Sequence, residues 1–131
     1  MEGLSASLRP VAGPRPTISL AVDLAWTGAG EWTGTVFEPV VPWDLRAWVD
    51  GQPAKVRQPA LDLAVQPHRL RLAPGAHVEL PSPIVLAFEP VGDDPFVWVL
   101  DAAPGATVEL EASIEVSGEA VALPRVTVQL P

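Results

Sequence analysis

The sequence contains no cysteine, no tyrosine and no asparagine, and Lys55 is its only lysine. The absence of cysteine excludes a disulfide, a thiolate metal site and a cysteine nucleophile. Alanine, proline, valine, leucine and arginine are abundant at the same time, as in proteins from GC-rich genomes. We therefore attach no functional meaning to the missing tyrosine and asparagine.

Positive charge is also scarce. Eight basic residues stand against sixteen acidic ones, which gives a formal net charge of −8. Such a chain is repelled by nucleic acids and by anionic membranes. No stretch approaches the ~18 apolar residues of a membrane span, and residues 1–16 lack the apolar core of a secretory signal. We expect no nucleic-acid or membrane partner and a cytoplasmic location.

Long stretches suited to helices are missing as well. Sixteen prolines and ten glycines are spread along the 131 residues, which leaves little room for helices of ordinary length. Residues 1–16 show Pro and Gly without periodicity, and we expect them to form a leading arm that is partly loose. Residues 17–131 have the length of one domain.

Alternation of apolar and polar side chains begins at Thr17. Residues 17–26 have the period of two that is typical of a half-buried strand. Further along the chain, the pair Asp50-Gly51 favours a tight turn between two strands. Strands are predicted at 17–26, 31–38, 43–49, 68–73, 77–80, 83–90, 94–101, 107–116 and 124–131, and residues 54–58 are a candidate for the short hairpin partner of 43–49. The continuous apolar runs Ile84–Phe88 and Phe96–Leu100 indicate strands that are covered on both faces, or strands whose outer face meets a partner.

The stretches APGAHVEL (73–80) and APGATVEL (103–110) are nearly identical. In each, the Pro-Gly pair suits a type II turn that opens a strand. The match ends with these stretches, so we interpret it as one turn-and-strand device used twice, not as a functional repeat. The predicted fold is all-β: a single β-sandwich of about eight or nine strands, with a closed β-barrel as the alternative.

The segment LRLAPGAHVEL (70–80), together with FVWVLDAAPGATVELEASIEV (96–116), resembles the second half of small bacterial immunoglobulin-like β-sandwich modules, such as the intracellular proteinase-inhibitor-like domains. WVDGQPAKV (48–56) is similar to an earlier hairpin of these modules. The resemblance implies an immunoglobulin-like sandwich over residues 17–131. Thr107 or Val108 replaces a corner tyrosine that such modules often carry, and no inhibitory loop can be transferred.

Catalytic groups are few. Only His68 and His77 could serve as an imidazole base, and no serine lies in a nucleophile-elbow context. We interpret both histidines as surface residues and the outward glutamates of the strands as a solvated face. The protein is therefore predicted not to be an enzyme and to use no cofactor.

Metal binding has one candidate. Asp93 and Asp94, with Asp101 nearby, could supply carboxylates for calcium at one end of a sandwich. A Gly-Asp-Asp-Pro turn explains the first pair equally well. We predict no metal site and leave calcium binding at these residues open.

The charges are segregated along the chain. Residues 46–71 hold five basic and two acidic residues, whereas residues 79–119 hold nine acidic residues and no basic one. One interpretation is cross-strand pairing on one sheet, and the other is a two-sided surface that orients a partner. Pairing predicts that Arg69 or Arg71 lies near one of three carboxylates: Glu79, Glu109 and Glu111.

The five tryptophans are unusually many for this length. Trp26 and Trp98 fall on inward registers and are predicted to lie in the core. Trp48 alternates with acidic and basic residues and should face outward, and Trp32 is expected to be accessible. An exposed tryptophan can anchor a protein interface, stack on a sugar ring, or cover an open end of the sandwich.

The sequence thus predicts a non-enzymatic protein-interaction or assembly module whose partner is another protein or a second copy of the chain. A carbohydrate- or small-ligand-binding module that uses Trp48 and Trp32 is one alternative, and a proteinase inhibitor is the other. The candidate interface residues are Trp48, Arg46, Trp32, Arg69 and Arg71.

Overall fold

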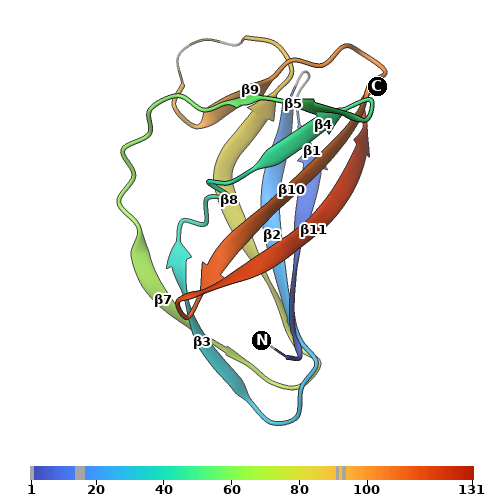
Figure 1. The fold of residues 1–131 in the computed structure, drawn as a ribbon. Helices are drawn as coiled ribbons and strands as arrows, with labels where there is room; N and C mark the ends of the chain where they lie inside the picture. The colour runs from blue at the N-terminus through green and yellow to red at the C-terminus, as the bar shows by residue number, and fades with distance from the viewer. Residues whose placement is uncertain (1, 14–16, 91, 93) are drawn as a thin grey trace.

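A computed structural model describes residues 2–13, 17–90, 92 and 94–131. All regular structure in this part of the chain is β, and its strands form two sheets (Figure 1), so the predicted all-β class is confirmed. Within these ranges, no helix has the length and apolar character that a membrane crossing requires. The strands are β1 (Leu4–Ala12), β2 (Thr17–Trp26), β3 (Trp32–Glu38), β4 (Arg46–Val49), β5 (Gln52–Ala54), β6 (Val56–Arg57), β7 (Gln66–Leu72), β8 (His77–Ala87), β9 (Val97–Leu100), β10 (Thr107–Val116) and β11 (Glu119–Gln129).

The first sheet has the order β1-β2-β8-β9-β6, and the second has the order β5-β4-β10-β3-β7, with β11 added beside β10. The β8–β9 pair is parallel. Apolar side chains from both sheets form one buried cluster, which includes Leu24, Ile84, Trp98, Leu110 and Leu123. The strands described here do not close into a single sheet, so the architecture is that of two layers and not the alternative closed barrel.

The expected leading arm is wrong for residues 4–12, because these form β1, which pairs with β2 along its whole length. Leu4, Ala6 and Leu8 point into the core, and Leu8 is only 2% exposed. Their alternation with Ser5 and Ser7 is the ordinary strand pattern. Residue 1 and residues 14–16 of the predicted arm lie outside the described residues.

Several strand limits also differ from the expected ones. The two strands predicted at 77–80 and 83–90 are one strand, β8, and the hairpin partner of β4 is β5, not residues 54–58. The chain crosses to the first sheet after β5, where β6 pairs with β9. The described residues form eleven strands, more than the expected eight or nine.

Proline fits this sheet-rich fold because the strand prolines lie where no neighbour needs their missing N–H. Strands β1, β5, β7 and β11 each pair with one strand only. Strand β8 contacts β9 only through Val85–Ala87, so Pro81 and Pro83 also lie on a free edge. This is the position at which a sheet tolerates proline. The strand prolines are Pro10, Pro53, Pro67, Pro81, Pro83 and Pro124.

The two Pro-Gly stretches are the same turn used in both sheets. Gly75 and Gly105 each have a φ of 82°, the positive value that the third residue of a type II turn requires. The turns close through Ala76 N–H to the Ala73 carbonyl (2.9 Å) and Ala106 N–H to the Ala103 carbonyl (3.1 Å). One turn opens β8 and the other opens β10, which confirms a structural device used twice.

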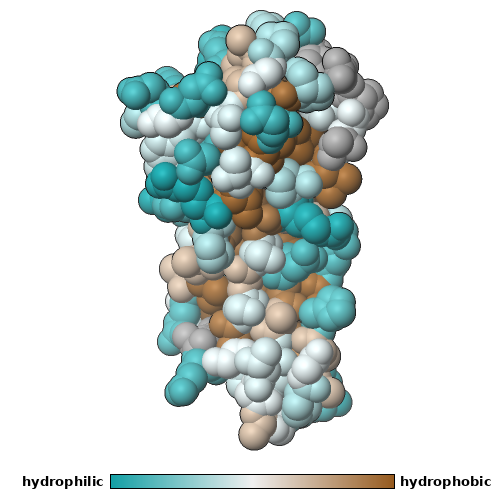
Figure 2. All heavy atoms as spheres, turned by 90° about the vertical axis from the view of Figure 1, so that its right-hand side faces the viewer, coloured by the Kyte–Doolittle hydropathy of each residue, from teal (hydrophilic) through white to brown (hydrophobic). Residues whose placement is uncertain are grey.

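One side of the molecule exposes two free edges. Strand β1 ends the first sheet, and it contacts β11, which lies at an edge of the second sheet. Figure 2 shows this side: apolar residues gather in a narrow band along it, with hydrophilic residues on both flanks. Side chains, rather than further backbone pairing, therefore cover the core between these edges.

Candidate functional site

The centre of the second sheet contains a gap that a loop fills. Strand β10 pairs with β11 over most of its length, but on its other side it pairs with β4 only at Val108–Glu111 and with β3 only at Val116. Residues 39–45, which connect β3 to β4, lie beside the part of β10 between these two pairings.

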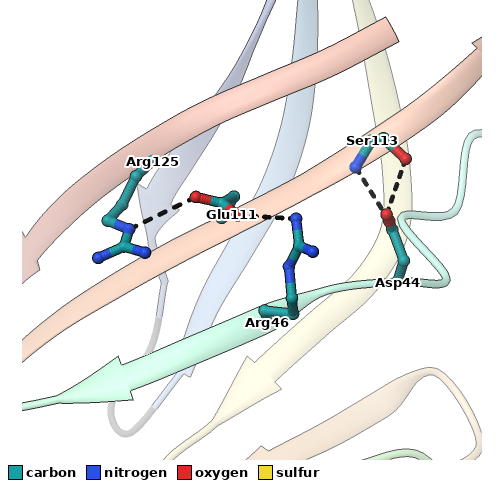
Figure 3. Close-up of polar contacts among 5 residues, drawn as sticks. All are labelled: Asp44, Arg46, Glu111, Ser113 and Arg125. Carbon is teal, nitrogen blue, oxygen red and sulfur yellow. Dashed lines mark hydrogen bonds and ion pairs between the residues drawn. The ribbon is translucent and has the colours of Figure 1, made fainter. Parts of the chain in front are cut away.

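Asp44 fastens this loop to β10. Its Oδ1 accepts a hydrogen bond from Ser113 N–H (2.9 Å), and its Oδ2 accepts one from the Ser113 hydroxyl (2.7 Å), as Figure 3 shows. The carboxylate thus accepts the Ser113 N–H hydrogen bond that the backbone of a neighbouring strand would otherwise accept. Val40 and Val41 are buried on the inner side of the loop, as is Pro42. The loop is therefore held from both sides.

Trp43 lies in this loop and has the most exposed large hydrophobic side chain among the described residues, at 52%. Contacts with two neighbouring residues nevertheless hold Trp43 in place. The centroid of its ring lies 6.2 Å from that of Trp98, which is fully buried. The Trp43 carbonyl also accepts a hydrogen bond from Gln58 Nε2 (3.2 Å). The indole is thus presented to solvent from a rigid position.

Two more exposed hydrophobic side chains, Phe37 and Val65, lie around Trp43, and each is 42% exposed. A hollow of about 170 Å³ is lined by Val36, Phe37, Pro39, Val40, Val41, Trp43, Val65, Ile114 and Glu115. A second hollow also borders Trp43, and Ile114 and Glu115 line both. We call Phe37, Trp43, Val65, Ile114 and Glu115 the Trp43 surface.

The predicted site residue Trp48 does face outward, but its ring is covered. The guanidinium carbon of Arg125 lies 3.6 Å from the ring centroid, within the range of a cation–π contact. Arg125 also lies 3.5 Å from Glu111, and Arg46 approaches the same carboxylate to 2.7 Å (Figure 3). Arg46 and Trp48 therefore belong to a network in which the side chains are already engaged.

Trp32 and Trp26 are both half-buried and lie against each other, with ring centroids 6.4 Å apart. A Cβ added to Gly34 would lie 2.4 Å from the Trp32 ring, so this ring rests over the glycine. The core position predicted for Trp98 is confirmed, whereas Trp26 lies only at the margin of the core and donates its indole N–H to the Gly30 carbonyl (2.9 Å).

The predicted partners of Arg69 and Arg71 are wrong. Arg71 lies 4.0 Å from Glu31, and in the described part of the chain Arg69 has no ion pair. Both arginines are on β7, which β3 separates from β10 with its Glu109 and Glu111. Cross-strand pairing itself occurs elsewhere, because Arg46 on β4 pairs with Glu111 opposite it on β10. Arg57 on β6 pairs with Asp101, which directly follows β9 (2.9 Å). The five predicted interface residues thus form no single site.

The residues considered for catalysis and metal binding lie apart. His68 Nδ1 is 4.0 Å from Glu38 Oε2 at the surface, and His77 is on β8 in the other sheet. Within the described ranges, no three His, Asp or Glu side chains are grouped so as to hold a metal ion. Of the calcium candidates, Asp93 lies outside these ranges, Asp94 accepts the Phe96 N–H (2.9 Å), and Asp101 pairs with Arg57.

A cavity of about 430 Å³ lies at one end of the sandwich. It is lined by Pro10, Gly13, Thr17, Ile18, Phe88, Glu89, Ala102, Pro104, Val128, Gln129, Leu130 and Pro131. The Gln129 amide is occupied within the wall, because its Nε2 donates to the Gly105 carbonyl (2.7 Å) and its Oε1 accepts from the Thr107 hydroxyl (2.8 Å).

Comparison of the chain with protein-family models, with curated proteins and with solved structures found no match.

The Trp43 surface was not predicted from the sequence. Continuing the alternation of β4 backward would place Trp43 on the same face as the buried Leu45 and Ala47. The available signal was the pair of prolines at 39 and 42, which favours a loop over a strand before Arg46. Phe37 and Val65 reach the same surface only through the tertiary fold.

Proposed function

We propose that this protein is a non-enzymatic protein-interaction module, which recognises its partner through the Trp43 surface. The observation that supports this is the clustering of exposed apolar side chains. Among the described residues, four large hydrophobic side chains are exposed, and three of them, Phe37, Trp43 and Val65, line one hollow. Contiguous apolar surface on a small protein marks interaction sites, and tryptophan is enriched among the residues that dominate binding energy.

The fixed position of the loop that carries Trp43 also supports a role in protein recognition. The Asp44–Ser113 hydrogen bonds and the contact with Trp98 fix the loop that carries Trp43. A side chain held in place before binding loses less conformational entropy when a partner covers it. The surface is thus suited to recognition without rearrangement of the fold.

Within this proposal the sandwich is of the immunoglobulin-like type. The two stacked sheets and the Pro-Gly turns that open β8 and β10 support this assignment. Modules of this kind commonly bind through loops or sheet surfaces positioned by a rigid scaffold. The Trp43 loop fits that arrangement.

The test compares two serine substitutions with equal starting exposure. Phe37→Ser removes part of the Trp43 surface, whereas Val11→Ser removes an apolar side chain of the same 42% exposure that does not line the hollow. Immobilised wild-type protein and Val11→Ser are expected to capture the same proteins from native extract, and Phe37→Ser is expected to lose them. Capture that is identical for all three proteins would contradict the proposal.

A second candidate is a binding site for a small apolar ligand in the cavity of about 430 Å³. Its volume lies within the ~300–1,000 Å³ typical of ligand pockets. The sugar-binding alternative has less support, because Arg125 covers Trp48 and Trp32 rests over Gly34. The proteinase-inhibitor alternative depends on the sequence resemblance alone.

A further inference from the structure

The ionisable residues that line the two hollows beside Trp43 are Glu115 and Asp44, both acidic. Among the described residues that line these hollows, none is Lys or Arg. Asp44 is committed to Ser113 through both carboxylate oxygens. Glu115 is exposed and lines both hollows, so it supplies the accessible charge of the Trp43 surface.

Glu115 differs from the other outward glutamates of β10. Glu109 and Glu111 are neutralised by Arg125, and Glu111 also by Arg46. In the described part of the chain, Glu115 has neither an ion pair nor a side-chain hydrogen bond. An unneutralised carboxylate beside an exposed indole and an apolar hollow is complementary to a side chain that carries positive charge next to apolar surface.

The net charge of the chain distinguishes two possible partners for the Trp43 surface, a second copy of the chain and a basic protein. A second copy would bring another formal charge of −8 toward an acidic surface, and like charges across an interface oppose association. A basic partner gains from the same field during its approach. Charge complementarity therefore favours a basic protein segment over self-association.

We propose that the Trp43 surface binds a short basic segment of a partner protein. An aliphatic side chain of the segment occupies the hollow lined by Phe37 and Trp43, and an adjacent Arg or Lys pairs with Glu115. The hollow of about 170 Å³ has room for one aliphatic side chain. This inference rests on the proposed function and specifies the partner's chemistry.

The experiment selects peptides from a random displayed library on the full-length protein and then measures the binding of the enriched peptides by fluorescence polarisation. We expect enrichment of Arg or Lys next to Leu, Ile, Val or Met. Glu115→Gln should weaken binding by a factor of about 1.4 to 5, the change that an exposed ion pair of ~0.2–1 kcal/mol gives. Higher salt should weaken binding to the wild type and have less effect on the variant.

Matched variants separate the possible results. Glu89→Gln removes an exposed acid at the other cavity, and Val11→Ser removes an exposed apolar side chain, so both should bind like the wild type. Phe37→Ser should lose binding, and Val65→Ser provides a second test of the hollow if the first variant melts at a lower temperature.

Neutral or acidic peptides that lose binding to Phe37→Ser but bind Glu115→Gln normally would overturn the basic-segment inference and leave the proposed function standing. No enrichment, or peptides insensitive to both Phe37→Ser and Val65→Ser, would overturn the inference and the proposed function together. Basic peptides insensitive to Glu115→Gln would overturn the pairing with Glu115.

Discussion

Replacing Trp98 with alanine is expected to lower the free energy of unfolding by about 3–5 kcal/mol, the range for the loss of a buried tryptophan. The side chain is fully buried on β9 and is among the largest in the core. Its ring also packs against the Trp43 ring, with the centroids 6.2 Å apart. The substitution should therefore reduce peptide binding at the Trp43 surface as well as stability.

Urea denaturation monitored by circular dichroism gives the change in stability. Trp98→Phe is the matched control, because it keeps an aromatic ring in the core and removes the indole N–H. Among the described residues this N–H has no hydrogen-bond acceptor, so its removal breaks no bond, and Trp98→Phe should cost less than half as much as Trp98→Ala. A loss below about 1 kcal/mol for Trp98→Ala would place the residue outside the core.

Leu8→Ala is expected to lower the free energy of unfolding by about 2–5 kcal/mol. Leu8 is 2% exposed and lies on β1, the edge strand of the first sheet. The neighbouring Ser7 points outward, so Ser7→Ala should change stability by less than ~0.5 kcal/mol. The same denaturation experiment compares the two variants. Equal and small effects would mean that residues 4–12 are the loose arm that the sequence suggested.

The local patterns in the sequence were sufficient for much of the fold. Alternation located β2 at Thr17–Trp26 and β10 at Thr107–Val116 with their observed limits. Turn chemistry was equally informative, because Asp50 and Gly51 both have positive φ (48° and 82°), as a tight hairpin turn requires. These features depend on neighbours in sequence, so one sequence can reveal them.

The errors concern features that depend on distant residues. Leu4, Ala6 and Leu8 alternate over a stretch too short to outweigh nearby prolines, and only pairing with β2 shows that the segment is a strand. The partner of Arg71 depends on the strand order, in which β3 separates β7 from β10. Strand β8 continues through Pro81 because β9 pairs only with its later part.

The candidate site was the least predictable feature for the same reason. Trp48 faces outward as expected, but Arg125 covers its ring, and Trp32, which was expected to be accessible, is half-buried with its ring over Gly34. The exposed ring of Trp43 results from a loop inserted between β3 and β4 and fixed by Asp44. Sequence periodicity contains no information on such an insertion.

Site-specific photocrosslinking in the cells that make this protein tests the central claim most directly. A photoreactive phenylalanine derivative is placed at Val65, on the Trp43 surface, or at Val11, which has the same exposure on β1. We predict a light-dependent adduct with another protein from position 65 and none from position 11. No adduct from position 65, or the same adducts from both positions, would contradict recognition through the Trp43 surface.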